Sequence, residues 1–279
     1  MSRALRGRLF QAALFLSLAV GLITLGTLLF DVLQKGIPYV DGILLTNPPS
    51  ADPGRAGARP AILATIYIGV LLILFTVPLG VGTAIYLEEY ANKERWYNRL
   101  LEVNIQNLAA VPSIVYGILG LAFLVRGLGL GRVLLAGALI LTLLVLPTII
   151  IAAREAIRAV PDSIRQGAYA LGATQWQVIW RQVLPAALPG IATGSILSLS
   201  RAIGETAPLL LIGALTYVAF DPTLMGSFTA LPVQIYNWTK LPQEEFKLLA
   251  AAAIVVLLMI LLTLNAVAIF LRNRYQKRW

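Results

Sequence analysis

The chain has 279 residues, of which 58% are hydrophobic and 13% charged, and its mean hydropathy is +0.81. Soluble domains carry about 25% charged residues, so this composition indicates a membrane protein. The sequence contains no cysteine and no histidine, which excludes disulfides, thiol nucleophiles, the usual zinc sites and catalysis by imidazole. The net charge of +9 does not indicate nucleic-acid binding, because the basic residues are sorted by membrane side and not gathered in one patch.

Six apolar stretches are long enough to cross a membrane, since a helix of about 20 residues spans the ~30 Å of hydrocarbon. They predict an all-α polytopic membrane protein with six transmembrane helices. The first stretch follows a basic start, but it is longer than a signal-peptide core and lacks a cleavage pattern, so we expect an uncleaved span. The predicted spans are 10–30, 61–87, 103–125, 133–153, 186–217 and 248–271.

Lysine and arginine are unevenly divided between the two sides of these spans. The two chain ends and the loops 88–102 and 154–185 together hold 14 of them, and the three opposite loops hold 7. Positive charge marks the cytoplasmic side. We therefore expect both termini to be cytoplasmic.

The segment 31–60 contains five prolines, which exclude a long helix or a central strand there. We interpret it as an external linker or docking loop. The chain is thus divided into 1–60, the first span with its Pro-rich external loop, and 61–279, a five-helix core with a long cytoplasmic loop at 154–185 and a short cytoplasmic tail.

The chain lacks the nucleotide-binding P-loop, in which a glycine-rich turn ends in Gly-Lys-Ser/Thr. Each of the five lysines follows a residue other than glycine. We expect no cofactor or metal bound by this chain and no enzymatic activity of its own. Any ATP would be hydrolysed by a partner.

The cytoplasmic loop 154–185 carries two sets of helix signals. Ser163 and Gln166 have capping-box spacing, and Gly172 fits the left-handed residue that ends a helix, which predicts a helix over 164–171. Thr174 begins a second, amphipathic helix with two tryptophans on one face. We expect Pro185 to end this helix and to begin the fifth span. The amphipathic face consists of Trp176, Ile179, Trp180 and Val183.

Two interpretations of this loop remain open: helices lying on the lipid interface, or a docking element for a cytoplasmic protein. The stretch resembles the cytoplasmic signature of ABC importer permeases, which reads Glu-Ala-Ala, three residues, Gly, nine residues, Ile-x-Leu-Pro. Gln166, Gly167 and Gln182 depart from the signature, and the lost glutamate removes a charge that an ATPase groove would read. The resemblance implies ATPase coupling by Gln166, Gly167, Ala168, Gly172, Trp176, Leu184 and Pro185.

Arg201 and Glu205 are charged residues placed well inside a predicted span, where each costs about 2.5–3.5 kcal/mol. They lie four residues apart on one helix face, which Ser198 extends, and Pro208 loosens the helix beside Glu205. One reading is a structural salt bridge. The other is an anion path, in which the guanidinium donates two parallel hydrogen bonds to an oxyanion and Glu205 accepts one from a protonated substrate such as phosphate. The path would comprise Ser198, Arg201, Glu205 and Thr206.

The run from Arg201 to Leu210, RAIGETAPLL, resembles the fifth helix of the A-type (PstA) permeases of bacterial phosphate ABC importers. The external run from Leu45 to Gly54 is similar to that family as well. The resemblance implies a type I ABC importer fold in the bacterial plasma membrane. It also implies phosphate as cargo and, as partners, a C-type permease, an ATPase dimer that uses ATP, and an external phosphate-binding protein.

The alternatives within this class are a permease for sulfate, molybdate or phosphonate, or the C-type partner itself. Two alternatives come from other classes of protein. One is an independent secondary anion transporter, which would show an internal repeat, and the other is a membrane enzyme. Two further features receive plain structural interpretations. The polar start of the third span, with Asn104 and Asn107, suits helix packing, and the acidic turn with Glu88 and Glu89 suits a solvated surface that could touch the ATPase.

Overall fold

The computed structural model describes residues 3–92, 94–214 and 217–275, and every regular element within them is a helix. Lys93, Lys277 and Arg278, which entered the charge count, lie outside the described residues. Five helices in the described residues are long and apolar enough to cross a membrane, and a bent pair makes six when it is counted as one span. The predicted all-helical, six-span architecture is confirmed.

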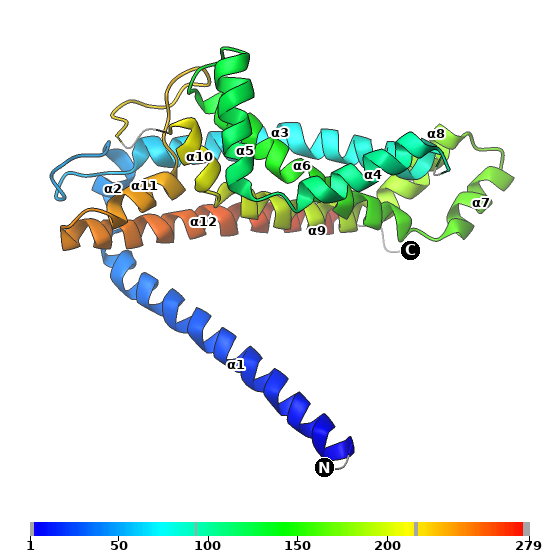
Figure 1. Ribbon diagram of the computed structural model, residues 1–279, viewed down its shortest axis with the longest axis horizontal. Helices are drawn as coiled ribbons and strands as arrows, with labels where there is room; N and C mark the ends of the chain where they lie inside the picture. The colour runs from blue at the N-terminus through cyan, green and yellow to red at the C-terminus, as the bar shows by residue number, and fades with distance from the viewer. Residues whose placement is uncertain (1–2, 93, 215–216, 276–279) are drawn as a thin grey trace.

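Four long helices run side by side and form the body of the molecule (Figure 1). α3 packs along α6, α6 packs along α9, and α12 packs against α9. Buried aliphatic side chains from these helices fill the core, among them Leu72, Leu141 and Ile149. The long helices are α3 (Arg59–Ile85), α6 (Leu134–Arg158), α9 (Leu184–Ile203) and α12 (Glu244–Tyr275).

α1 (Arg3–Gly36) meets the body only near its C-terminal end and projects away from it (Figure 1). At Gly36 a Cβ would lie 2.6 Å from the backbone oxygen of Ala251, so the close contact with α12 requires glycine. The aliphatic side chains from Phe10 to Phe30 are exposed. An apolar helix of this length is a membrane span, as predicted for 10–30.

The third crossing is bent, whereas one continuous span over 103–125 was predicted. α4 (Trp96–Ala109) and α5 (Ser113–Gly120), which continues into the π turn η3 (Leu121–Gly127), meet at 104°. Pro112 stands at the break as the N-cap of α5. Proline disfavours helical backbone in the residue before it and has no N–H for the helix ladder, so the apolar run continues while the helix does not.

The predicted fifth span, 186–217, is also interrupted. α9 ends at Ile203, and the short helix α10 (Ala207–Ile212) follows after three residues, with Pro208 in its first turn. Gly213 then adopts φ +87°, a left-handed conformation that ends α10. Residues 215 and 216, at the end of the predicted span, lie outside the described residues.

The loop 154–185 contains α7 (Asp162–Ala170) and α8 (Gln175–Val178), which we call the coupling element. The capping box of Thr174 with Gln177 is present, and Gly172 has φ +79°, as predicted. The predicted start of α7 is wrong: the helix begins at Asp162, after Pro161, because an acidic residue in the first turn suits the helix dipole.

α8 continues through the π turn η4 (Ile179–Val183) into α9, so Pro185 does not separate two helices as predicted. Pro185 lies in the first turn of α9, where proline is tolerated. The coupling element is therefore joined to α9 without an intervening loop.

At the opposite end of the body, the Pro-rich segment folds over α11 (Leu231–Thr239) and the start of α12. It contains the 3-10 turn η1 (Ile37–Tyr39) and α2 (Gly42–Thr46). Leu44 from this segment is buried with Trp238 and Phe246. Figure 1 places this Pro-rich cap and the coupling element at opposite ends of the long helices.

Candidate functional site

A polar cavity lies where the bend between α4 and α5 meets the break after α9. Its volume is about 20 Å³, room for about one water molecule. It sits beside the middle of α6, and Ser198, Arg201 and Glu205 line it together, as the sequence predicted for three of the four path residues. The other lining residues are Ala109, Val111, Leu144, Val145, Thr148 and Ala202.

Arg201 and Glu205 form a loose pair in this cavity. Arg201 Nε lies 3.7 Å from Glu205 Oε1, beyond the 2.7–3.2 Å of a good hydrogen bond. The Arg201 side chain is 74% exposed and that of Glu205 only 19%. Arg201 occupies the last turn of α9, where the helix dipole favours a cation. The guanidinium is therefore held near the carboxylate yet available to a further group.

The backbone around this pair is irregular at mid-height of the helices. Glu205 lies between α9 and α10, and its N–H donates to Ala202 O over 3.1 Å. Thr206 is the N-cap of α10 and is not among the residues that line the cavity. Non-helical backbone at membrane depth is tolerated where it is buried in protein or borders water. The two helix interruptions thus share one polar location.

An exposed arginine at this depth constrains what covers the surface. Facing hydrocarbon would cost several kcal/mol, and such residues face the bundle interior or a water-filled cavity. In the described structure Arg201 is not covered by this chain. The face that carries Arg201 therefore borders either a second protein or an aqueous path.

The predicted coupling residues occupy one end of the molecule but differ in exposure. Gln166 and Gly167 on α7, Gly172 in the turn and Trp176 on α8 are exposed. Ala168 and Leu184 instead pack against a buried cluster. Pro185 is half-buried.

The outer face of the coupling element is unusually apolar. Leu171 and Tyr169 are exposed, and the rings of Trp176 and Trp180 lie side by side with centroids 5.1 Å apart. Ile179, predicted on the same face as the tryptophans, is buried. Exposed aromatic and aliphatic groups at a helical corner are typical of a protein-binding surface.

Sequence reasoning missed a buried ion-pair cluster beneath the coupling element. Glu88, expected on a solvated surface, has only 4% of its side chain exposed. Its Oε1 accepts from Arg154 Nε over 2.9 Å and from Arg158 Nη2 over 2.8 Å. Arg154 also pairs with Glu102 over 2.7 Å. The signal available in the sequence was an acidic pair and several arginines on the same side of the membrane.

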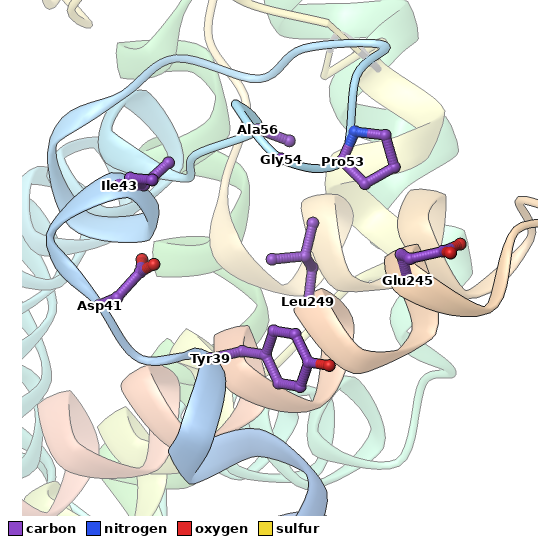
Figure 2. Close-up of a pocket in the computed structure, with 8 residues that line it drawn as sticks. All are labelled: Tyr39, Asp41, Ile43, Pro53, Gly54, Ala56, Glu245 and Leu249. Atoms are coloured by element: carbon purple, nitrogen blue, oxygen red, sulfur yellow. The ribbon is translucent and has the colours of Figure 1, made fainter.

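A second cavity, of about 250 Å³, opens in the Pro-rich cap (Figure 2). Figure 2 shows the Asp41 and Glu245 carboxylates beside the apolar side chains of Ile43 and Leu249. No basic residue is among those that line it. Two carboxylates repel an anion, so the charge in this cavity disfavours one, whereas the guanidinium of Arg201 attracts one.

Comparisons with known proteins place the chain among transport proteins. Residues 76–279 match the family model described as "binding-protein-dependent transport system inner membrane component". The probable ABC transporter permease protein YqgH of Bacillus subtilis is 39% identical over 165 residues, 57% of this chain and 52% of that protein. The phosphate transport system permease protein PstA 1 of Mycobacterium tuberculosis is 32% identical over 276 residues, 98% of this chain and 90% of that protein.

The fold has solved counterparts as well. A chain of a bacterial ABC transporter that imports the acidic polysaccharide alginate superposes with a TM-score of 0.68 at 19% identity, over 98% of this chain and 97% of that one. The likeness covers the fold and, at this identity, nothing finer. With a family model over most of the chain and a relative over nearly all of it, the chain belongs to the binding-protein-dependent transport system inner membrane components and, among them, to the PstA permeases.

Proposed function

We propose that this chain is the A-type permease subunit of an ATP-driven importer that carries inorganic phosphate across the bacterial plasma membrane. The observation that carries the proposal is the loosely paired, exposed Arg201 at a helix break, in a chain similar over 98% of its length to a phosphate permease. The subunit itself has no catalytic role. Two ATPase subunits would hydrolyse ATP, a C-type permease would complete the path, and an external phosphate-binding protein would deliver the anion.

The polar groups that line the cavity suit an oxyanion in passage, and the helices must separate to widen the cavity beyond its volume of about 20 Å³. The two terminal nitrogens of Arg201 can donate parallel hydrogen bonds to two oxygens of phosphate, which a lysine ammonium cannot match. Glu205 holds the guanidinium and accepts a hydrogen bond from phosphate, which is protonated at neutral pH, whereas sulfate offers no such proton. Ser198 supplies a neutral hydroxyl on the same wall.

The coupling element supports the ATP-driven part of the proposal. Its exposed aromatic face is turned away from the bundle, and it continues directly into α9, the helix that carries Arg201. A displacement of α7 and α8 by the ATPase would therefore reach the anion path along one helix. With the coupling element in the cytoplasm, both chain termini are cytoplasmic and the Pro-rich cap is external.

The first test is to purify the tagged chain gently from native membranes and to identify what accompanies it. A P-loop ATPase together with a second, non-identical permease supports the proposal. The chain alone, active in anion transport, would contradict it.

The second test measures [³²P]phosphate uptake by the reconstituted complex with sulfate, molybdate and phosphonate as competitors. Glu205→Gln should lower the preference for phosphate over sulfate, because an amide can donate to either anion. If that preference is unchanged, the selectivity assigned to Glu205 is wrong. Stronger uptake of another oxyanion would replace phosphate as the cargo.

A further inference from the structure

Both helices of the coupling element are attached to one residue at the end of α3. α3 ends in the π turn η2 (Tyr86–Tyr90), and Glu89 lies within it. From α7, Arg165 Nη2 lies 2.9 Å from Glu89 Oε1, and from α8, Gln175 Nε2 donates to the backbone oxygen of Glu89 over 2.6 Å. Only 8% of the Glu89 side chain is exposed, so the attachment is shielded from solvent.

Arg165 also ties this point to α6. Its Nη1 donates to Val160 O over 2.6 Å and its Nη2 to Ile157 O over 3.0 Å. Ile157 lies in the last turn of α6 and Val160 two residues after its end, where carbonyls remain open to side-chain donors. One guanidinium therefore fixes α7 to the ends of both α3 and α6.

The adjoining Glu88 cluster extends the same attachment. Glu88 binds Arg154 and Arg158 on the last turns of α6, directly before the coupling element. Apolar side chains such as Ala84 and Ala168 already bring α3 and the coupling element together. Apolar contact is non-directional, however, whereas charged hydrogen bonds fix orientation. The ion pairs therefore set the position of surfaces that apolar packing alone would let slide.

We propose that Glu89, which holds the coupling element, and Glu88, which holds the end of α6 directly before it, are positioning residues that lock this end of the molecule to the end of α3, so that the ATPase moves α3 together with α9. The proposal rests on the ATP-driven function proposed above. α9 receives the motion through the covalent continuity of η4, but α3 lies more than 60 residues earlier in the chain and receives it through these contacts. Removing them should free α3 while α9 still responds.

The test uses the complete importer complex in proteoliposomes, and this chain contains no cysteine, so labels can be placed freely in it. Spin labels at Leu74→Cys on α3 and Leu262→Cys on α12 report the position of α3. Labels at Leu197→Cys on α9 and Leu262→Cys report α9. All three side chains are exposed. The interlabel distances are measured with and without ATP.

In the parent both distances should change with ATP. In Glu88→Gln/Glu89→Gln the α9 change should persist and the α3 change should be lost. Phosphate imported per ATP hydrolysed should fall about tenfold, within the range of typical coupling between sites, whereas a merely structural defect would lower import and hydrolysis together. Glu155→Gln is the matched control, because it removes an exposed carboxylate that pairs with Arg158 over 3.3 Å in the same cluster, and it should change neither readout.

An unchanged α3 response in the double variant overturns the proposal. So does the loss of both responses with a normal Glu155→Gln, since the pairs would then hold the coupling element on the ATPase and not on α3. If the parent complex hydrolyses ATP but moves no phosphate, the proposed cargo fails instead, and the distance measurement, which needs ATP alone, still decides the role of Glu88 and Glu89.

Discussion

The closest approach of a glycine on one long helix to another long helix predicts that one added methyl group lowers the stability of the protein. On α9, Gly190 and Gly194 face Ala156 and Ala152 on α6, the small-residue spacing that lets membrane helices approach closely. A Cβ at position 194 would lie 2.4 Å from Ala152 Cβ, whereas carbon atoms pack at about 3.5–4.0 Å. Neither methyl group can rotate away, so Gly194→Ala must push the helices apart by about 1 Å. Overpacking of this kind costs about 1–3 kcal/mol.

Thermal unfolding of the purified protein measures this cost, and at about 2–4 °C per kcal/mol the Tm should fall by about 2–12 °C. Adding Ala152→Gly should restore it, because the nearest remaining atom, Ala152 Cα, is an ordinary contact at 3.7 Å. The control is Gly82→Ala, where a Cβ meets nothing within 4 Å. A Gly194→Ala protein as stable as the parent, or a double variant no better than the single, would refute the reasoning.

Three further substitutions test other parts of the argument. Arg201→Lys keeps the charge but loses the planar pair of donors, so phosphate uptake should fall about tenfold, the equivalent of one good charged hydrogen bond; undiminished uptake would exclude a bidentate contact. Arg154→Gln removes the buried guanidinium that bonds to Glu88 and Glu102 and should cost about 1.5–3 kcal/mol of stability, as for a hydrogen bond to a charged group, whereas Arg55→Gln, at an exposed pair, should change stability by under about 1 kcal/mol. Gly172→Ala must adopt φ +79° and should weaken docking of the ATPase with a cost of about 1–2 kcal/mol in the turn; equal recovery of the ATPase with the variant would contradict this.

The features predicted correctly from the sequence are those determined by residues close together in the chain. Apolar length placed the sixth span at 248–271, inside the observed α12, and local capping chemistry predicted the box at Thr174 and the left-handed Gly172. Each of these is determined within a few residues of chain. The same local reasoning brought Ser198, Arg201 and Glu205 to one wall, because residues three and four apart share a helix face.

Features that depend on distant residues or on backbone bonding were missed. Hydropathy contains no information on a missing backbone N–H. The apolar pattern therefore predicted continuous spans, whereas new helices begin at Pro112 and beside Pro208. Glu88 was expected in solvent because its position in the chain is a loop between spans. Its burial depends on Arg154, 66 residues later, which only the fold brings close. The other lining residues of the polar cavity, on α4 and α6, were missed for the same reason.

The contrast between the two arginine environments locates the surface that this subunit leaves for others. Beside the coupling element, Arg154 and Arg165 are enclosed by carboxylates and carbonyls of the same chain, and their distances are those of full hydrogen bonds. Arg201 has one carboxylate at 3.7 Å and most of its surface open. Arg201, in the last turn of α9, is thus the arginine whose donors stay available to the partners proposed above. If the proposed function holds, a second permease and a passing anion would complete the site on the face of α9 that carries Arg201.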